Sequence, residues 1–172
     1  MPLERLYAGW RSSWVQNSPK DGDSSACVMC DIFSSDLDDE NLVVYRSKNS
    51  MVILNLFPYG SGHVLVVPKD HVPNLSDLDR ETKNEMFALL EDIVDAINDV
   101  YSPSGINVGA NFGRDAGAGI PDHLHFHALP RFQGDSGFIT AIAETRVLPE
   151  PLEETLMRLR SGFKPNSILA AK

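Results

Sequence analysis

The residues of this chain best suited to chemistry are three histidines in strict alternation. They lie in the segment His123-Leu124-His125-Phe126-His127-Ala128-Leu129. Alternate side chains of a β-strand share one face, so the three imidazoles would point one way and the apolar side chains between them would enter a core. Packing alone explains this pattern poorly, because each neutral ring brings a donor and an acceptor that need partners. The pattern indicates either a metal cluster or a catalytic histidine flanked by orienting ones.

Two further histidines and two cysteines add to this set. His63 follows a glycine-rich turn and His71 follows Pro-Lys-Asp, so one site could draw on distant segments. Cys27 and Cys30 are the only cysteines, and their C-x-x-C spacing is that of half a zinc site, which needs two further ligands. A redox motif is disfavoured because no strand–helix pattern of the thioredoxin type surrounds the pair. Two cysteines make no disulfide framework, which favours a reducing cytoplasm.

A glycine-rich stretch from Gly113 to Ile120 directly precedes the triplet. Small residues let backbone amides approach an anion closely, and successive amides can form an anion-binding nest. Arg114 and Arg131 add positive charge on either side. Beside three histidines, this stretch predicts a site for an anion.

Composition limits the partners that the chain can bind. It has 172 residues, a length typical of one domain, and 15 Lys and Arg against 24 Asp and Glu give a formal charge of -9. Such a chain is unsuited to binding nucleic acid or a membrane through a broad basic face. The N-terminus has no continuous apolar core of the signal-peptide kind, and no apolar run approaches the roughly 18 residues of a membrane helix. We therefore expect a cytoplasmic protein.

Hydrophobic periodicity predicts the elements that position these residues. Apolar runs separated by turns predict five strands, at Asn41–Arg46, Ser50–Leu56, Val64–Val67, Ile106–Phe112 and His123–Leu129. Apolar residues three and four apart predict a long helix over Ser76–Tyr101, with Ser76 and Asp79 as a capping box. A shorter helix is predicted over Pro149–Arg160. Short turns between most strands favour an antiparallel sheet with helices against it, an α+β fold.

The triplet resembles the signature of the histidine triad (HIT) family, His-φ-His-φ-His-φ-φ, in which φ is apolar. The resemblance covers roughly residues 27–160 and continues through Asn55–Lys69, Asn107–Gly113, Ala116–Gly119 and Pro130–Asp135. It implies a HIT-like fold, in which a long and a short helix pack on an antiparallel sheet of about five strands. Residues 1–172 would form one HIT domain, with an N-terminal extension at 1–26 and a C-terminal tail at 161–172.

The resemblance also implies a role for each matched residue. His125 would attack the α-phosphorus of a nucleotide, and water or phosphate would then take the nucleotidyl group from it. His127 would bind phosphate oxygens or the leaving group, and His63 and His123 would support them. The implied substrate contacts are Asn55 on a ribose hydroxyl, Leu56 and Phe57 near the base, and Asn111, Gly117, Ala118, Gly119 and Arg131 around the phosphates.

A structural zinc ion is a further implication of the resemblance. In zinc-bearing relatives the C-x-x-C pair is completed by the histidine after Pro-Lys-x and by the first histidine of the triplet. These four ligands would be Cys27, Cys30, His71 and His123. Such a zinc would have every position closed by protein and would pin the N-terminal segment to the catalytic strand. The alternative is two free cysteines, with His123 merely orienting its neighbours.

The leading functional hypothesis is a nucleotidyl transferase or hydrolase, with phosphorolysis of a dinucleoside polyphosphate such as diadenosine tetraphosphate as its preferred form. Arg131, Lys69 and Arg114 would favour phosphate over water as acceptor. The loops Ala116–Gly119 and Gly134–Phe138 resemble those of the diadenosine tetraphosphate phosphorylase branch and its bacterial relatives.

Three alternatives remain open at the level of sequence. One is a HIT-family hydrolase of dinucleoside polyphosphates or nucleoside phosphoramidates, and another is a nucleotide-binding regulator with little turnover. The third is a metalloenzyme in which all three triplet histidines bind one catalytic zinc. Family members generally pair across a sheet edge and a helix, so a homodimer or larger assembly is expected. Trp10 and Trp14 are candidates for the subunit contact.

Overall fold

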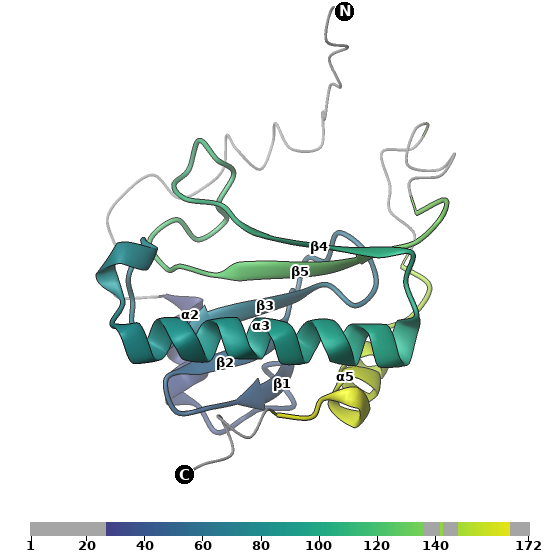
Figure 1. Ribbon diagram of the computed structural model, residues 1–172, viewed down its shortest axis with the longest axis horizontal. Coiled ribbons are helices and arrows are strands. Elements are labelled where there is room, and N and C mark those ends of the chain that lie inside the picture. The colour runs from purple at the N-terminus through teal and green to yellow at the C-terminus, as the bar shows by residue number, and fades with distance from the viewer. Residues whose placement is uncertain (1–26, 136–141, 143–147, 166–172) are drawn as a thin grey trace, which may run out of the picture.

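The fold is a five-stranded antiparallel sheet with helices packed on it, as Figure 1 shows. The computed structural model describes residues 27–135, 142 and 148–165. In chain order its elements are helix α2 (Val28–Ser34), strands β1 (Val43–Arg46), β2 (Ser50–Leu54) and β3 (Val64–Pro68), a 3-10 turn (Leu75–Asp77), helix α3 (Arg80–Tyr101), strands β4 (Gly105–Ala110) and β5 (Phe126–Arg131), and helix α5 (Leu152–Gly162). The predicted α+β class, antiparallel sheet, long helix and short helix are confirmed.

The strands lie in the order β1-β2-β3-β5-β4, and every neighbouring pair is antiparallel. β5 therefore lies between β3 and β4, so the triplet enters the sheet away from its edges. Leu65 pairs with His127, and Gly109 pairs with His127 from the other side. This register sets which residues surround the third histidine.

The two faces of the sheet bury different cores. The larger core, with α3 and α5, holds Leu124, Phe126 and Ala128, and α3 crosses the front of the sheet in Figure 1. A smaller core on the other face joins α2 to the side chains of β1, β2 and β3. Leu124, Phe126 and Ala128 thus enter a core together, as the alternation predicts.

Several boundaries differ from those that the sequence predicts. α3 begins at Arg80, and the Asp79 carboxylate accepts a hydrogen bond from the Thr82 amide at 2.7 Å, so Asp79 and not Ser76 is the N-cap. Ser76 lies in the preceding 3-10 turn. α5 is shifted towards the C-terminus, and Gly162 lies inside it because its last turn packs against α3.

Two differences bear on the candidate site. β5 begins only at Phe126, so His123 and His125 precede the regular strand, where the Leu124 amide donates to the Val72 carbonyl at 2.7 Å. α2 was not predicted, because its seven residues are too few for a clear helical period. It carries Cys30 in its first turn, with Cys27 as its N-cap.

Some expectations fall on parts of the chain outside the described residues. Trp10, Trp14 and residues 136–138 belong to this group. Within the described part of the chain, no helix is both long and apolar enough to cross a membrane.

Candidate functional site

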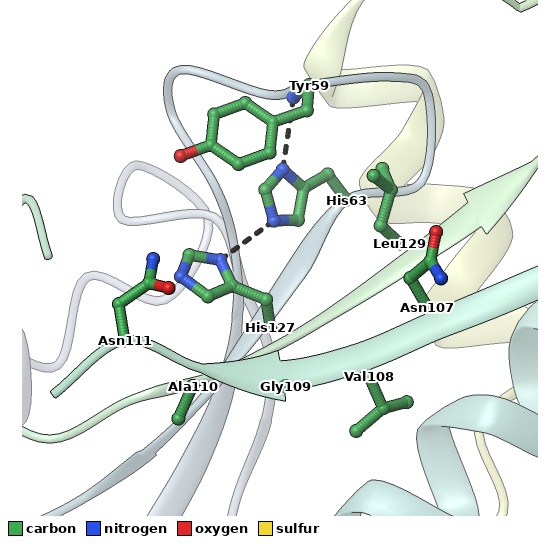
Figure 2. Close-up of a pocket in the computed structure, with 9 residues that line it drawn as sticks. All are labelled: Tyr59, His63, Asn107, Val108, Gly109, Ala110, Asn111, His127 and Leu129. Atoms are coloured by element: carbon green, nitrogen blue, oxygen red, sulfur yellow. Dashed lines mark hydrogen bonds between the residues drawn. The ribbon is translucent and has the colours of Figure 1, made fainter. Parts of the chain in front are cut away.

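A pocket of about 260 Å³ lies where β4 and β5 meet the loop before β3. Its walls come from three segments, as Figure 2 shows. The lining residues are Tyr59, His63, Asn107, Val108, Gly109, Ala110, Asn111, His127 and Leu129. Two of the five histidines therefore line one pocket, although 63 residues separate them in the chain.

Hydrogen bonds determine the tautomers of these two histidines. The Tyr59 amide donates to Nδ1 of His63 at 3.0 Å, so this nitrogen carries no proton. A neutral His63 ring then has its proton on Nε2, which lies 2.9 Å from Nδ1 of His127 and donates to it. His127 in turn carries its own proton on Nε2.

This Nε2–H of His127 is an unsatisfied donor in a residue that lines the pocket. It is buried and has no hydrogen-bond partner among the described residues. Figure 2 shows it on the side of the ring that faces Asn111. Burial, followed by the proximity of His125, lowers the pKa of His127 to about 4, so the ring is neutral at pH 7. A buried donor without a partner is costly unless a ligand supplies an acceptor.

His125 presents the opposite nitrogen chemistry. Its Nδ1 donates to the backbone carbonyl of His123 at 2.8 Å, which leaves Nε2 unprotonated in the neutral ring. Burial lowers the pKa of His125 and favours this neutral form. The rings of His125 and His127 lie 5.0 Å apart, nearly edge to face. Two rings of opposite nitrogen chemistry are therefore neighbours, and of the two only His127 lines the pocket, since His125 is buried beside it.

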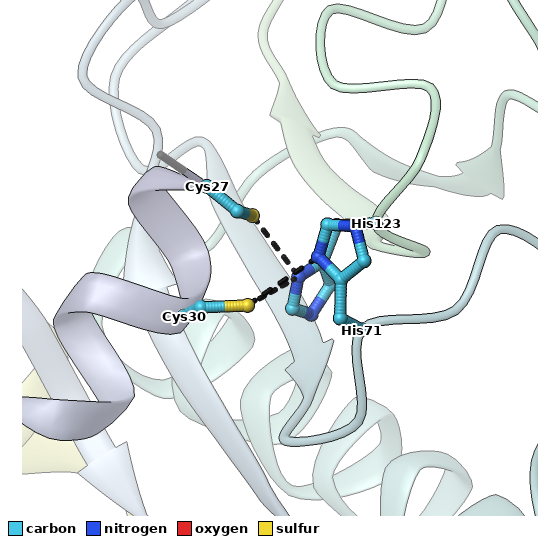
Figure 3. A group of neighbouring side chains, drawn as sticks. All are labelled: Cys27, Cys30, His71 and His123. Carbon is cyan, nitrogen blue, oxygen red and sulfur yellow. Dashed lines mark hydrogen bonds between the residues drawn. The ribbon is translucent and has the colours of Figure 1, made fainter. Parts of the chain in front are cut away.

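The first histidine of the triplet belongs to a separate cluster, shown in Figure 3. Cys27, Cys30, His71 and His123 each offer one ligand atom, and these atoms lie within 4.8 Å of one another. Nδ1 of His123 is 3.3 Å from Sγ of Cys27 and 3.6 Å from Sγ of Cys30. Nδ1 of His71 is 3.4 Å from Sγ of Cys30. This cluster could hold a metal ion.

The donor set fits zinc on two grounds. Sulfur and nitrogen ligands in a zinc tetrahedron lie about 3.3–3.8 Å from one another, and the three sulfur-to-nitrogen separations given above fall in this range. Nε2 of His123 donates to the Pro68 carbonyl at 2.8 Å, so its Nδ1 has a free lone pair aimed at the thiols. Burial raises the pKa of the Cys30 thiol to about 11, and a metal would favour its thiolate.

Arg46 on β1 holds the helix that carries the cysteine pair. Its guanidinium donates to the carbonyls of Ile32 and Ser35, at 3.1 Å each, at the C-terminal end of α2. It also forms an ion pair with Asp38 at 2.6 Å. α2 is therefore anchored to the sheet at the end opposite to Cys27.

The other implied substrate residues are placed unevenly. Asn111 lines the pocket, whereas Asn55, Leu56 and Phe57 lie in the loop after β2 and are not among its lining residues. Leu56 is 62% exposed and Phe57 79% exposed, as apolar side chains available to a ligand would be. The side-chain oxygen Oδ1 of Asn55 accepts from the Phe57 amide at 3.0 Å and so shapes this loop.

The implied phosphate contacts are largely engaged within the protein. The Gly117 amide donates to Arg114 and the Ala118 amide to Gly113, both within the glycine-rich loop. Of the three implied amides, only that of Gly119 makes no backbone hydrogen bond among the described residues. Arg131 forms an ion pair with Asp135 at 2.6 Å and donates to Asn107 at 3.0 Å. Its charge is therefore partly neutralised within the protein.

Sequence reasoning did not single out Tyr59, Asn107 or Leu129, which line the pocket. The signal for Leu129 was available, because it follows His127 by two residues and so shares its face. Asn107 and Asn111 alternate in the same way along β4 and beyond it. Tyr59 carried no such signal, since its ring reaches His63 and His127 only through the path of the loop.

Comparison with known proteins agrees with this geometry. Residues 37–134 match the HIT domain family. The chain is 38% identical over 157 residues to a Mycobacterium tuberculosis protein named AP-4-A phosphorylase, covering 89% of this chain and 80% of the relative. It is 40% identical over 93 residues to a Schizosaccharomyces pombe protein named bis(5'-nucleosyl)-tetraphosphatase (asymmetrical), covering 54% of this chain and 50% of that one.

Solved structures show the same fold. A Zn-bound histidine triad family protein from Mycobacterium smegmatis has a TM-score of 0.65 and 32% identity, covering 81% of this chain and 94% of its own. A histidine triad nucleotide-binding protein from Sulfolobus tokodaii has a TM-score of 0.65 and 30% identity, covering 79% and 91%.

Proposed function

Because the chain belongs to the histidine triad (HIT) family, a family of nucleotide-processing proteins, we propose that it transfers a nucleotidyl group through His125. The observation that carries this proposal is the arrangement of nitrogens beside the pocket. His125 has an unprotonated Nε2, and the neighbouring His127 has a buried Nε2–H without a partner. A nucleophile beside an unsatisfied donor suits attack on a phosphorus atom whose oxygens need hydrogen bonds.

The proposed reaction has two displacements. The Nε2 lone pair of His125 forms a bond to the α-phosphorus, and the bond from phosphorus to the bridging oxygen breaks with its electron pair on the leaving group. His127 donates a hydrogen bond to a phosphate oxygen while this charge shifts. An acceptor then attacks the same phosphorus and breaks the P–N bond, which restores His125.

The proposed substrate is a dinucleoside polyphosphate. With a pKa of about 4, His127 is a neutral hydrogen-bond donor at pH 7 and not a proton-donating imidazolium. A polyphosphate leaves as a stable anion and needs no proton, whereas the amine of a phosphoramidate must be protonated to leave. The names of the M. tuberculosis and S. pombe relatives support the same substrate class.

The proposed acceptor is inorganic phosphate, so that diadenosine tetraphosphate yields ATP and ADP. The name of the M. tuberculosis relative is its main support. Positive charge favours phosphate less than the sequence indicates, because Arg131 is paired with Asp135. Lys69 and Arg114 are exposed and lie outside the pocket lining.

An assay with isotopically labelled phosphate tests both substrate and acceptor. Diadenosine tetraphosphate is incubated with the protein, with and without phosphate, and the nucleotides are separated. The proposal expects ATP and ADP, with the label in ADP, and no products from the His125→Ala variant. ATP and AMP at a rate independent of phosphate would assign water as acceptor. No turnover of any dinucleoside polyphosphate would leave a phosphoramidate hydrolase or a nucleotide-binding regulator.

Zinc is the proposed metal, held by Cys27, Cys30, His71 and His123. It would supply a closed structural cross-link between α2 and the residues just before β5. The His123 carbonyl accepts the hydrogen bond that sets the His125 tautomer, so His123 connects this cluster to the nucleophile. The Zn-bound relative from M. smegmatis supports the choice of metal. A reducing cytoplasm, the proposed location, would keep both thiols available.

A homodimer is the proposed assembly, formed through β4. The two edges of the sheet differ, because Arg160 of α5 donates to the Val43 carbonyl on β1, whereas β4 has mostly exposed residues. Val108 on β4 is 50% exposed, and Phe87 on α3 is 55% exposed. An open, apolar edge strand is a template for pairing with a second copy. Sedimentation of Val108→Lys should show monomers where the unmodified protein shows dimers, and a monomeric unmodified protein would refute the assembly.

A further inference from the structure

We infer that Tyr101, at the end of α3 and outside the pocket lining, is a positioning residue that holds His63 against His127. The inference starts from the turn that carries His63. Gly62 adopts a φ of +77°, and a Cβ built there would lie 2.9 Å from Cγ of Pro130 and 3.2 Å from Cε2 of Tyr101. The turn is therefore pressed between β5 and the Tyr101 ring.

Backbone hydrogen bonds connect the packed turn at Gly62 to the position of His63. The His63 amide donates to the Gly60 carbonyl at 3.3 Å, and the His63 carbonyl accepts from the Asn55 amide at 2.9 Å. Only 1% of His63 is exposed, so its ring has little freedom once the backbone is set. The direction of the ring decides whether Nε2 reaches Nδ1 of His127 at 2.9 Å.

Residues of α5 and of the segment just before it hold Tyr101 in place. Its hydroxyl donates to the carboxylate of Glu150, whose side chain is 9% exposed. The same carboxylate accepts from the Thr155 hydroxyl at 2.8 Å and pairs with Arg158 at 3.3 Å. The Arg158 guanidinium also lies 5.9 Å from the centre of the Tyr101 ring. A tyrosine held at both hydroxyl and ring provides a rigid surface for Gly62.

Loss of the contact between Tyr101 and the turn would change the tautomer of His127. If the Tyr101 ring is lost, the turn can relax towards the vacated space and His63 withdraws from His127. Nδ1 of His127 is then free to take up the proton, and the Nε2–H donor in the pocket is no longer enforced. Tyr101 thus acts on the reaction through His63, without touching the substrate.

A nuclear magnetic resonance experiment tests this step without reference to turnover. The ring ¹⁵N shifts of His127 in the unmodified protein should show an unprotonated Nδ1 and a protonated Nε2. In Tyr101→Leu both shifts should move towards the average of the two tautomers. Tyr101→Phe keeps the ring and loses only the hydrogen bond to Glu150, so it should move the shifts far less. Tyr45→Leu is the matched control, because Tyr45 stacks on Phe163 at 4.9 Å and not on this turn. An unchanged His127 pattern in Tyr101→Leu would overturn the inference.

A kinetic cycle with His63 adds a second test, and this arm alone rests on the proposed function. Tyr101→Leu should lower kcat by about tenfold or more with little change in KM, since small misplacements have effects of this size. In a His63→Ala background the same change should alter kcat by less than about twofold. Equal losses in both backgrounds would show that Tyr101 does not act through His63 and would overturn the inference. If no substrate is turned over by any variant, the proposed function fails and the ¹⁵N shifts still decide the role of Tyr101.

A further variant covers the case in which Tyr101→Leu does not fold. Glu150→Ala removes the acceptor of the Tyr101 hydroxyl and leaves the ring and the α3 core in place. It should shift the His127 signals in the same direction by a smaller amount. Signals identical to those of the unmodified protein would count against the inference.

Discussion

His123 and His127 lie four residues apart in one segment, but their ring nitrogens have different hydrogen-bond partners. His123 uses both ring nitrogens, because Nε2 donates to the Pro68 carbonyl and Nδ1 faces the sulfurs of Cys27 and Cys30. His127 uses only Nδ1, and its Nε2–H is buried without a partner among the described residues. A side chain with all its polar atoms engaged holds structure, whereas one with an unsatisfied donor is prepared for a ligand.

His125 lies between these two histidines in the sequence and interacts with both. Its Nδ1–H is held by the backbone carbonyl of His123, and its ring lies against that of His127. The end of the segment that faces the cysteines thereby sets which nitrogen of His125 is unprotonated, and the pocket end carries the unsatisfied hydrogen-bond donor. The four predictions that follow separate these contributions.

The largest effect is expected for the residue between the two regions. His125→Ala should lower turnover by about four to six orders of magnitude, because it removes the proposed nucleophile. Nucleotide binding, measured by calorimetry, should persist. Near-normal turnover in this variant would exclude a covalent intermediate on His125.

The second largest effect is expected at the pocket end. His127→Ala removes a donor to the developing charge and should lower kcat by about 10²–10³-fold. His127→Gln, whose side-chain amide offers an N–H at similar reach, should recover part of this loss. Steady-state kinetics of the two variants give the comparison. Equal activities in alanine and glutamine variants would show that the donor is not what matters.

A smaller effect on turnover and a larger one on stability are expected at the proposed zinc site. Cys27→Ser should lower both the zinc content and the melting temperature, because the metal binds only the folded cluster. Turnover should fall by about 10- to 100-fold, the size usual for groups that orient a site from outside it. Val28→Ala is the control on the same helix, since Val28 is 51% exposed. Full zinc content in Cys27→Ser would remove this residue from the ligand set.

The smallest effect is expected on how the free energy of unfolding depends on pH. The pKa of His127 is lowered to about 4 by burial and by the nearby His125, against about 6.5 for a histidine in an unfolded chain. Below pH 6.5 the unfolded chain therefore binds more protons at this residue, so its contribution to the free energy of unfolding falls between pH 6.5 and 4. The ¹⁵N signals of His127 should stay those of a neutral ring to below pH 5. A midpoint near 6.5 would mean that the ring is solvated.

The order and type of the main elements could be predicted from the sequence because they depend on local patterns. Three- and four-residue spacing of apolar residues marked α3, and alternation placed Leu124, Phe126 and Ala128 in the core. The ends of the helices were harder to predict from the sequence. Whether Ser76 or Asp79 is the N-cap of α3 depends on where the chain leaves the sheet. The helix α2 was missed because tertiary contacts from Arg46 and the buried Met29 and Ile32 stabilise a segment too short to show a period.

The sequence by itself shows three histidines that alternate beside a glycine-rich loop, and two cysteines with the spacing of half a zinc site. Only the tertiary structure decided which nitrogen of each histidine carries a proton. That choice depends on acceptors and donors from distant segments, such as the Pro68 carbonyl for His123 and the Tyr59 amide for His63. Spacing along a strand fixes the direction of a side chain, but its chemistry is set by neighbours that the chain brings together only on folding.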